Sequence, residues 1–380
     1  GAAFILIYLV FLVLLGLPIL VSEFAVGRSS RLSTARAFHK LEPEGSNFHK
    51  YSYMGMIGNY MLMMFYTMVA GWMMYYCYVM ATGKLSGATS EEVGGFFSNL
   101  MTSTGTMTGW MIAAVLLAFG VCSLGLKNGI ERITKVMMIC LLALIVVLAV
   151  HSVTLDGAME GVKFYLVPNL DNIREAGLGN VIFGALSQAF FTLSIGIGAM
   201  EIFGSYTAKT HTLPGEAVRI CALDTFVALT LNALVIICTL YTKDGPLAGG
   251  YTGDITATLG KTNLAQTAFG SVFGASLGAK FVAICLLFFA FSTILSWNLF
   301  GKINANYLFG RKNSKLCSVI YTIIALVFIF LGTVSGSDFV WELTDMFNNL
   351  IVLPNVIALF ALTGMVIASL NEVQKDKLKV

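Results

Sequence analysis

Long apolar stretches recur along the chain, and short segments that hold most of its charged residues separate them. Each stretch is close to the roughly 20 residues that a helix needs to cross the hydrocarbon core of a bilayer. Nine windows can be drawn, near residues 2–24, 54–82, 109–126, 136–155, 180–205, 219–241, 278–300, 316–334 and 346–369. Lipid offers no hydrogen-bond partner to the backbone, so each crossing must satisfy its own amides as a helix. The pattern predicts an all-α polytopic membrane protein with nine transmembrane helices.

Composition agrees with this class. Hydrophobic residues make up 57% of the chain and charged residues only 11%, whereas soluble domains are about a quarter charged. The mean hydropathy is +0.82. A multi-pass protein of the inner or plasma membrane, embedded in the lipid bilayer, is expected.

Basic residues predict the orientation, because Lys and Arg near span ends stay on the cytoplasmic side. Most of the 23 basic residues fall in alternate loops, for example between residues 28 and 50 and between 302 and 315. The net charge of +3 therefore reflects topology, and no concentrated basic face exists for a nucleic-acid partner. The first window then runs from outside to inside, so we expect a further span or a signal upstream of Gly1.

Catalytic motifs are missing from the sequence. The seven cysteines contain no C-x-x-C pair. The histidines His39, His49, His151 and His211 share no metal-ligand spacing, so no metal site is expected at them. No zinc-hydrolase, nucleophile-elbow or phosphate-loop motif occurs, and we expect that the protein is not an enzyme.

Small and polar residues interrupt the window 180–205, which contains Thr192, Ser194, Gly196 and Gly198. Two glycines spaced by one residue weaken the helix at the bilayer midplane, which predicts a break. Freed carbonyls and hydroxyls suit a small hard cation, and an exposed helix N-terminus suits a carboxylate. The alternative is that these small residues only allow close helix packing.

Asp224 lies several residues inside the window 219–241. An ionisable group at that depth costs roughly 2.5–3.5 kcal/mol, so it usually faces a cavity or a partner charge. No Lys or Arg lies at similar depth elsewhere, and a bound cation is the predicted counter-charge; protonation is the alternative. Glu201, nearer the cytoplasmic end, is expected to reach water or to pair with Lys209.

Ordered motifs extend from the first residue to Asp224. They are Gly1-Ala-Ala-Phe-Ile-Leu-Ile-Tyr8, Gly16-x-Pro18…Glu23…Gly27-Arg28, Tyr66…Gly71-Trp72, Gly125-x-x-x-Gly129-Ile-Glu131-Arg132, Lys163-Phe-Tyr165-x-x-Pro168 and Gln188-x-x-Phe191-Thr192-Leu-Ser194-x-Gly196-x-Gly198. In these residues the chain resembles the neurotransmitter:sodium symporter family in its bacterial form. The resemblance implies a LeuT-type fold of two inverted five-helix repeats around a midplane site.

By this resemblance the nine windows are helices two to ten of the fold, and the family's first helix is missing. The whole chain, 1–380, is then one transporter domain, with 1–155 as the remainder of the first repeat and 180–369 as the second. Beyond about Asn232, the motifs Phe288-Phe-Ala290-Phe-Ser292-Thr293 and Trp341-Glu-Leu-Thr-Asp345 resemble the alanine/glycine:cation symporter family. The chain is either an unusual natural member or a composite of two related genes.

The resemblance implies a substrate site and a gate. Tyr66 would bind the substrate carboxylate, with an interface-belt aromatic as the alternative role. The remaining residues of the substrate pocket would be Leu62, Phe191, Ser194, Gly196 and Ile197. Phe191 has plain core packing as its alternative. Asp345 has the spacing of the extracellular gate aspartate, although an acid at an exposed helix start is the alternative.

The resemblance also implies ion sites. Thr192 and Asp224 would bind one sodium ion, and Thr293 would bind a second together with a neighbouring hydroxyl, Ser292 or Ser296. Two residues of the family's chloride site are matched, Tyr8 and Gln188. Ala228 stands where that site needs a hydroxyl or an acid, so chloride independence is expected.

Together these features predict a sodium-coupled symporter of neutral amino acids that works by alternating access, because the pocket wall carries no charge. A proton-coupled carrier, with the proton on Asp224, is the closest alternative. A passive channel, a non-transporting sensor and an incomplete membrane fragment are the others, since the ligands that the family takes from its first helix are absent.

Overall fold

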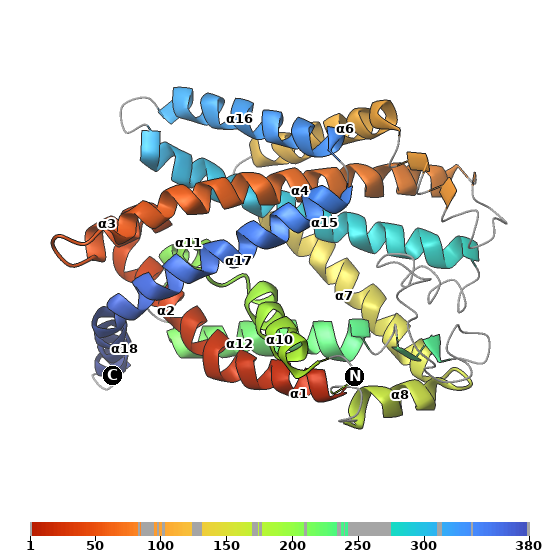
Figure 1. Ribbon diagram of the computed structural model, residues 1–380, viewed down its shortest axis with the longest axis horizontal. Helices are drawn as coiled ribbons and strands as arrows, with labels where there is room; N and C mark the ends of the chain where they lie inside the picture. Colours follow the sequence, from red (N-terminus) through yellow and green to blue (C-terminus); the bar gives the residue numbers. More distant parts are fainter. Residues whose placement is uncertain are drawn as a thin grey trace.

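The computed structural model describes residues 2–82, 84, 95–96, 99–100, 103–123, 131–168, 174, 177–208, 211–233, 237–238, 240–241, 275–309, 314–335 and 337–377. Within these residues every regular element is a helix, and the helices form one bundle (Figure 1). The all-α class is therefore confirmed. The motif glycines Gly125 and Gly129 lie outside the described residues.

The first apolar stretch forms three consecutive elements: α1 (Ala2–Phe11), the π-helical turn η1 (Leu12–Gly16) and α2 (Leu17–Ser30). This π-helical turn lies directly before Pro18. Proline has no backbone N–H, and its ring would clash with the carbonyl four residues earlier in a regular α-helix, so the helix widens at this point and then continues. α2 extends beyond the expected window because its polar residues Glu23, Arg28 and Ser30 are buried in protein.

Two short elements connect this stretch to the next: α3 (Thr34–Leu41) and the 3-10 turn η2 (Phe48–Lys50). α2 ends at Arg31, which has a left-handed φ of 56° and donates its backbone N–H to the carbonyl of Gly27 at 2.9 Å. This arrangement satisfies an orphan carbonyl of the helix end and redirects the chain into α3.

α4 (Tyr51–Ala81) lies at the centre of the bundle. About 67% of its most apolar window is buried inside the protein, compared with 22–33% for the other candidate spans. It packs against four further helices: α6 (Thr104–Ser123), α15 (Ala275–Phe309), α16 (Ser314–Val334) and α17 (Ser337–Ala361). Figure 1 shows α6 and α16 above α4.

Seven further elements complete the described bundle. They are α7 (Arg132–Val153), α8 (Ala158–Leu166), α10 (Leu178–Thr192), α11 (Ala199–Tyr206), α12 (Leu213–Thr225), η4 (Phe226–Ala233) and α18 (Thr363–Lys377). α1 packs against α10, while α2 packs against α11, α12 and α18. Gly27 and Gly204 let α2 and α11 approach so closely that a Cβ on either would overlap the other backbone.

Six helical stretches in the described part of the chain are long and apolar enough to cross a membrane. They are Ala2–Ser30, Phe48–Val79, Thr104–Val121, Arg132–Val153, Leu316–Thr333 and Phe339–Ala361. The multi-pass membrane class is thus confirmed. Of the other expected windows, 180–205 is split into α10 and α11, 219–241 is described only in part, and 278–300 falls within α15. The count of nine crossings stays a prediction.

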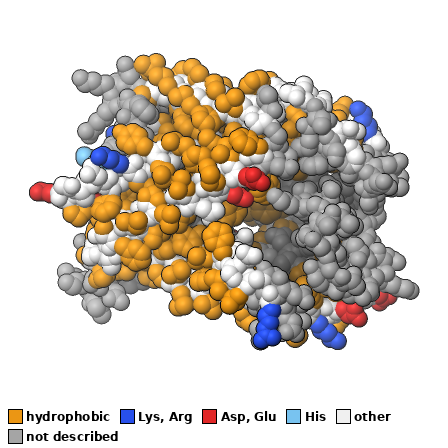
Figure 2. Space-filling view, viewed as in Figure 1, with side chains coloured by type: hydrophobic (Ala, Val, Ile, Leu, Met, Phe, Trp, Pro, Cys, Tyr) orange, Lys and Arg blue, Asp and Glu red, His pale blue; other side chains and the backbone are white. Residues whose placement is uncertain are grey.

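Large apolar side chains cover much of the outer surface (Figure 2). On α16 the exposed residues follow the helical repeat: Leu316, Val319, Ile320, Ile323 and Val327. In water such a stripe would need a protein partner, but a bilayer accepts it directly. The outer face of α16 is therefore suited to lipid.

Candidate functional site

The predicted helix break is present. Residues 193–198 separate α10 from α11 and form a non-helical segment, the 193–198 break. The φ angle is +50° at Ser194, +84° at Gly196 and +80° at Gly198. Glycine adopts these values readily, whereas a non-glycine residue there costs roughly 1–3 kcal/mol. The two glycines therefore account for the interruption, and Ser194 is held in place by its surroundings.

Glu23 of α2 and Asn355 of α17 fix one backbone amide of the break. The Oε1 atom of Glu23 accepts hydrogen bonds from the N–H of Gly196 at 2.8 Å and from Nδ2 of Asn355 at 2.6 Å. Both side chains are completely buried. A buried carboxylate needs donors, so this network ties Gly196 to two helices that are far away in sequence.

Two hydroxyl groups bind the freed carbonyls of the break. The Tyr51 hydroxyl donates to the carbonyl of Gly196 at 2.8 Å, and the Thr34 hydroxyl donates to the carbonyl of Gly198 at 2.8 Å. Tyr51 is the first residue of α4, and Thr34 is the first residue of α3. The break is thus held from α2, α3, α4 and α17, which satisfies backbone groups that lipid cannot.

The sequence motifs predict no role for Glu23, Thr34, Tyr51 or Asn355. Glu23 carried a usable signal, because an acid inside an apolar stretch is expensive and usually functional. A side chain that donates a hydrogen bond to a backbone group far away in sequence leaves no sequence pattern. The contacts of Thr34, Tyr51 and Asn355 could therefore not be predicted.

Glu201 is buried, so the prediction that its side chain reaches water is wrong. The side chain is completely buried, and neither carboxyl oxygen has a hydrogen-bond partner in the described part of the chain. The reason is the close glycine contact, which presses α11 against α2. Its suggested partner Lys209 lies outside the described residues.

Thr192 and Asp224, the two predicted ligands of one sodium ion, lie together. Thr192 ends α10, Asp224 lies in the last turn of α12, and the Thr192 hydroxyl donates to Oδ2 of Asp224 at 2.6 Å. Asp224 is half-buried. A carboxylate and a hydroxyl oxygen are hard ligands, so the pair fits a small cation chemically.

The two matched chloride-site residues lie near this pair. Tyr8 of α1 is buried and interacts with both Thr192 and Asp224. Gln188 is exposed and lies one turn before Thr192 on α10. Ala228 lies in η4 and brings no polar side chain to the group.

The hydroxyls predicted for the second ion form a separate group on α15. Ser292 and Thr293 donate to the carbonyl of Phe289 at 3.0 and 2.7 Å, and Ser296 donates to the carbonyl of Ser292 at 3.1 Å. Each hydroxyl proton is therefore bound within the helix, while the oxygen lone pairs stay available as ligands.

The predicted pocket wall is brought together in part. Leu62 is buried, and Tyr66 and Ile197 pack against the same hydrophobic cluster between α4, α6, α11 and α15. Ser194 and Gly196 lie in the break that adjoins Ile197. Phe191 is different: its side chain is 42% exposed and lies outside the clusters of the described core.

Asp345, the predicted gate, lies on α17 and interacts electrostatically with Tyr66 of α4. The rings of Phe65 and Trp341 meet edge to face at 4.8 Å and join the same two helices. Asp345 is exposed. It therefore lies near Tyr66, the residue predicted to bind the substrate carboxylate, and is not enclosed by the described protein.

A cavity of about 290 Å³ lies between the α2–α3 connection, α11 and α15. Its lining includes Arg31, Arg36, Ser205 and Ile303. Arg31 donates to the carbonyl of Ser205 at 2.8 Å across its wall. The cavity adjoins α11 and contains none of the predicted substrate or sodium ligands.

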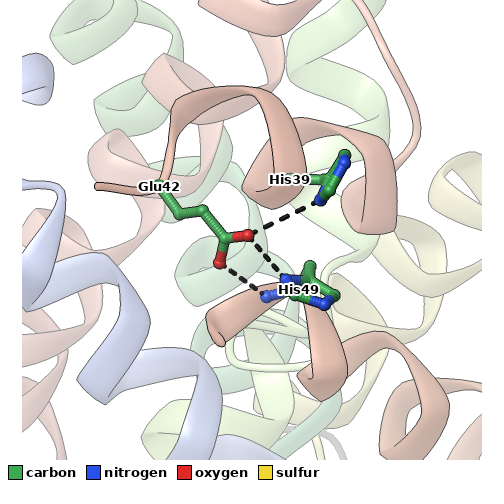
Figure 3. A group of neighbouring side chains, drawn as sticks. All are labelled: His39, Glu42 and His49. Carbon is green, nitrogen blue, oxygen red and sulfur yellow. Dashed lines mark hydrogen bonds and ion pairs between the residues drawn. The ribbon is translucent and has the colours of Figure 1, made fainter. Parts of the chain in front are cut away.

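A second polar group lies between α3 and α4 and was not expected (Figure 3). His39, Glu42 and His49 point toward one another, and their potential ligand atoms all lie within 4.8 Å of one another. The spacing of the histidines along the sequence does not predict that His39 and His49 lie together. The spacing His39-x-x-Glu42 is visible in the sequence. The position of His49 beside these two residues depends on how the intervening turn folds.

Two family models match the chain. The Sodium:alanine symporter family model matches residues 50–379, and the Sodium:neurotransmitter symporter family model matches residues 1–93. Both resemblances are therefore confirmed, although the alanine symporter match begins much earlier than its motifs predicted. The two matches overlap over residues 50–93, which include α4.

The chain is 35% identical over 229 residues to the uncharacterized sodium-dependent transporter YhdH of Bacillus subtilis, an alignment that covers 60% of this chain and 50% of YhdH. It is 28% identical over 283 residues to the sodium/alanine symporter AgcS of Methanococcus maripaludis, covering 73% of this chain and 58% of AgcS. The chain thus spans about half the length of these curated relatives. The crystal structure of MhsT in complex with L-phenylalanine matches with a TM-score of 0.79 and 28% identity, over 98% of this chain and 85% of MhsT.

Proposed function

Since the chain belongs to the sodium:alanine symporter family, we propose that it is a sodium-coupled symporter that carries neutral amino acids by alternating access. The matched families are transporters and not enzymes. The observation that carries the proposal is the hydrogen-bonded pair Thr192–Asp224 at the end of the helix that leads into the 193–198 break. The pair offers a cation a charge and two hard oxygen ligands at one place.

In this mechanism the sodium ion binds Thr192 and Asp224 and neutralises the carboxylate. The substrate carboxylate then binds between the cation and the N-terminus of α11, with Tyr66 as a further donor. Each ligand raises the affinity of the other by the same factor, as linkage requires. Inward movement of one sodium charge supplies about 2.3 kcal/mol per 100 mV.

The selectivity proposal rests on the pocket wall. Leu62 and Ile197 are apolar, so they favour a substrate whose side chain is neutral. The relatives support this class in their own names: AgcS is a sodium/alanine symporter, and the MhsT structure contains L-phenylalanine.

Further roles belong to the same proposal. The α15 hydroxyls Thr293, Ser292 and Ser296 bind a second sodium ion, and Asp345 closes the outer gate over Tyr66. Transport is independent of chloride, because Ala228 supplies neither a hydroxyl nor an acid. Alternating access arises from two inverted repeats, residues 1–155 and 180–369, that rock against each other.

The test is uptake of labelled alanine into proteoliposomes that contain the whole chain, with sodium replaced by choline at fixed pH. We expect uptake to require sodium and Asp224→Asn to raise the half-saturating sodium concentration roughly tenfold or more, which corresponds to about 1.4 kcal/mol. Asp156→Asn, the same substitution at an exposed loop position, is the matched control and leaves uptake unchanged.

The alternatives give different outcomes. Sodium-independent uptake that follows a pH gradient identifies a proton-coupled carrier. Uptake without saturation identifies a channel. Saturable binding without uptake identifies a sensor or an incomplete unit, and each of these results rejects the sodium symporter.

A further inference from the structure

The cluster formed by His39, Glu42 and His49 joins two helices at the start of α4 (Figure 3). Oε1 of Glu42 lies 2.6 Å from Nδ1 of His49 and 3.6 Å from Nδ1 of His39. Oε2 of Glu42 accepts the backbone N–H of His49 at 3.0 Å. The two imidazole rings meet edge to face with their centroids 5.1 Å apart.

We propose that His39, Glu42 and His49 bind a divalent transition-metal ion of the zinc type. Two imidazole nitrogens and one carboxylate oxygen form the ligand set that such borderline metals prefer, whereas calcium and magnesium prefer oxygen ligands throughout. Ligand atoms around a tetrahedral zinc ion lie roughly 3.3 Å apart for bonds of about 2 Å. The observed separations bracket that value, so small side-chain rotations complete the site.

The surroundings of the cluster suit this role. The side chain of His39 is 66% exposed, which leaves an open direction for entry of the ion and for a water molecule as fourth ligand.

The site is connected to the 193–198 break. His39 lies at the end of α3, whose first residue Thr34 holds the carbonyl of Gly198, and His49 precedes Tyr51, which holds the carbonyl of Gly196. The ring of Phe38, beside His39, also packs edge to face on the ring of Tyr51 at 5.8 Å. A metal ion that fastens His39 to His49 fixes the distance between the two helices that hold the break.

This connection predicts that metal binding slows transport, a consequence that rests on the proposed function. Alternating access needs the helices around the break to move, and a crosslink between α3 and α4 restrains two of them. Binding of the metal itself does not depend on the proposed function.

The binding test is titration of the purified whole chain with Zn²⁺ alone, measured by calorimetry. A second titration with Co²⁺ is measured by the visible absorption of the bound ion. We expect one high-affinity equivalent. His39→Ala should raise Kd at least tenfold without disturbing the fold, because His39 is exposed. The matched control is His211→Ala, which removes a histidine that lies 2.9 Å from a single carboxylate, Glu216, and should leave Kd unchanged.

A titration with no saturable equivalent overturns the proposal, as does equal affinity in His39→Ala and in the unaltered chain. The conservative variant His49→Gln keeps a side-chain donor to Glu42 but loses an imidazole ligand, so it should fold and bind Zn²⁺ at least tenfold more weakly. Unchanged affinity in His49→Gln also overturns the site.

The coupling test repeats sodium-driven alanine uptake with and without Zn²⁺. Uptake that falls severalfold in the unaltered chain, and stays unchanged in His39→Ala, supports the coupling. Zinc binding without any effect on uptake overturns the coupling. A chain that binds zinc but shows no sodium-driven uptake rejects the proposed function instead, so the two failures are distinguishable.

Discussion

Tyr165 shows how a single buried hydroxyl supports the bundle. It lies in α8, and its hydroxyl donates to the carbonyl of Leu229 at 2.8 Å. Leu229 belongs to η4, where the wide turns leave carbonyls in need of donors. Burial of the ring raises the pKa of Tyr165 to about 12, so the neutral form is kept in the folded protein.

The alkaline stability of the protein should therefore depend on Tyr165. An unfolded tyrosine ionises near pH 10, so the contribution of Tyr165 is complete below that pH and is lost as pH rises toward 12. Tyr165→Phe should lower the free energy of unfolding by about 1 kcal/mol at pH 8. In Tyr165→Phe the free energy of unfolding should also decrease less steeply between about pH 9.5 and 11 than in the unaltered chain.

The measurement is the thermal unfolding midpoint in detergent at several pH values. Tyr53→Phe, which alters an exposed tyrosine, is the control. Parallel curves for Tyr165→Phe and the unaltered chain would contradict the assignment.

Single residues also show what the sequence could predict of the site. Thr192 and Asp224 were predictable, because a hydroxyl and an acid at bilayer depth need partners and few are available there. Thr34 and Tyr51 were not, since they bind backbone carbonyls and any donor at that position would serve. The exposure of Phe191 was equally hidden, because it depends on how α10 is rotated in the bundle.

At the scale of the helices, the crossing of α2 and α11 is the tightest constraint on the break. A Cβ added to Gly204 would lie 2.6 Å from the carbonyl oxygen of Phe24, which is backbone and cannot yield. Glu23, the residue directly before Phe24 on α2, holds the amide of Gly196. Close packing and the hydrogen bond therefore act on the same segment.

Gly204→Ala should separate the two helices and lower the free energy of unfolding by roughly 1–3 kcal/mol, the usual cost of overpacking. The matched control is Gly184→Ala in α10, where a Cβ would meet only ordinary contact with Phe4 and gain helix propensity. Thermal unfolding in detergent checks both variants. Equal midpoints for the two would show that the crossing tolerates a methyl group.

The sequence predicts the ends of a helix well where the helix faces lipid, and poorly where its polar residues are buried against other helices. The windows 136–155 and 316–334 nearly coincide with α7 and α16, whose outer faces are apolar. The first window, 2–24, is shorter than the helix because hydropathy counts Arg28 and Ser30 as a polar end, although the structure buries both side chains. The break itself was predictable from Gly196 and Gly198.

At the scale of the whole molecule, ligand binding and folding are linked. Sodium that binds Thr192 and Asp224 only in the folded protein stabilises it by RT ln(1 + [Na⁺]/Kd), or about 1.4 kcal/mol at ten times Kd. Replacement of choline by sodium in the buffer should therefore raise the thermal unfolding midpoint by a few degrees. Alanine should raise it further in sodium than in choline, because the two ligands are coupled.

Asp224→Asn supplies the control for this measurement, since it should reduce the increase caused by sodium. Glu216→Gln alters another acid of the same helix, outside the pair, and should retain the increase. An identical response to sodium in the unaltered chain and in Asp224→Asn would show that the cation binds elsewhere.

The length of α4 has a consequence for the cell. Its 31 residues rise about 46 Å, whereas the hydrocarbon layer is about 30 Å thick. Even with a typical inclination of about 20°, roughly ten residues of this rod remain beyond the acyl chains. Lys50, the exposed residue directly before this rod, is therefore within reach of solutes in the adjoining aqueous compartment, which need not dissolve in the lipid to contact it.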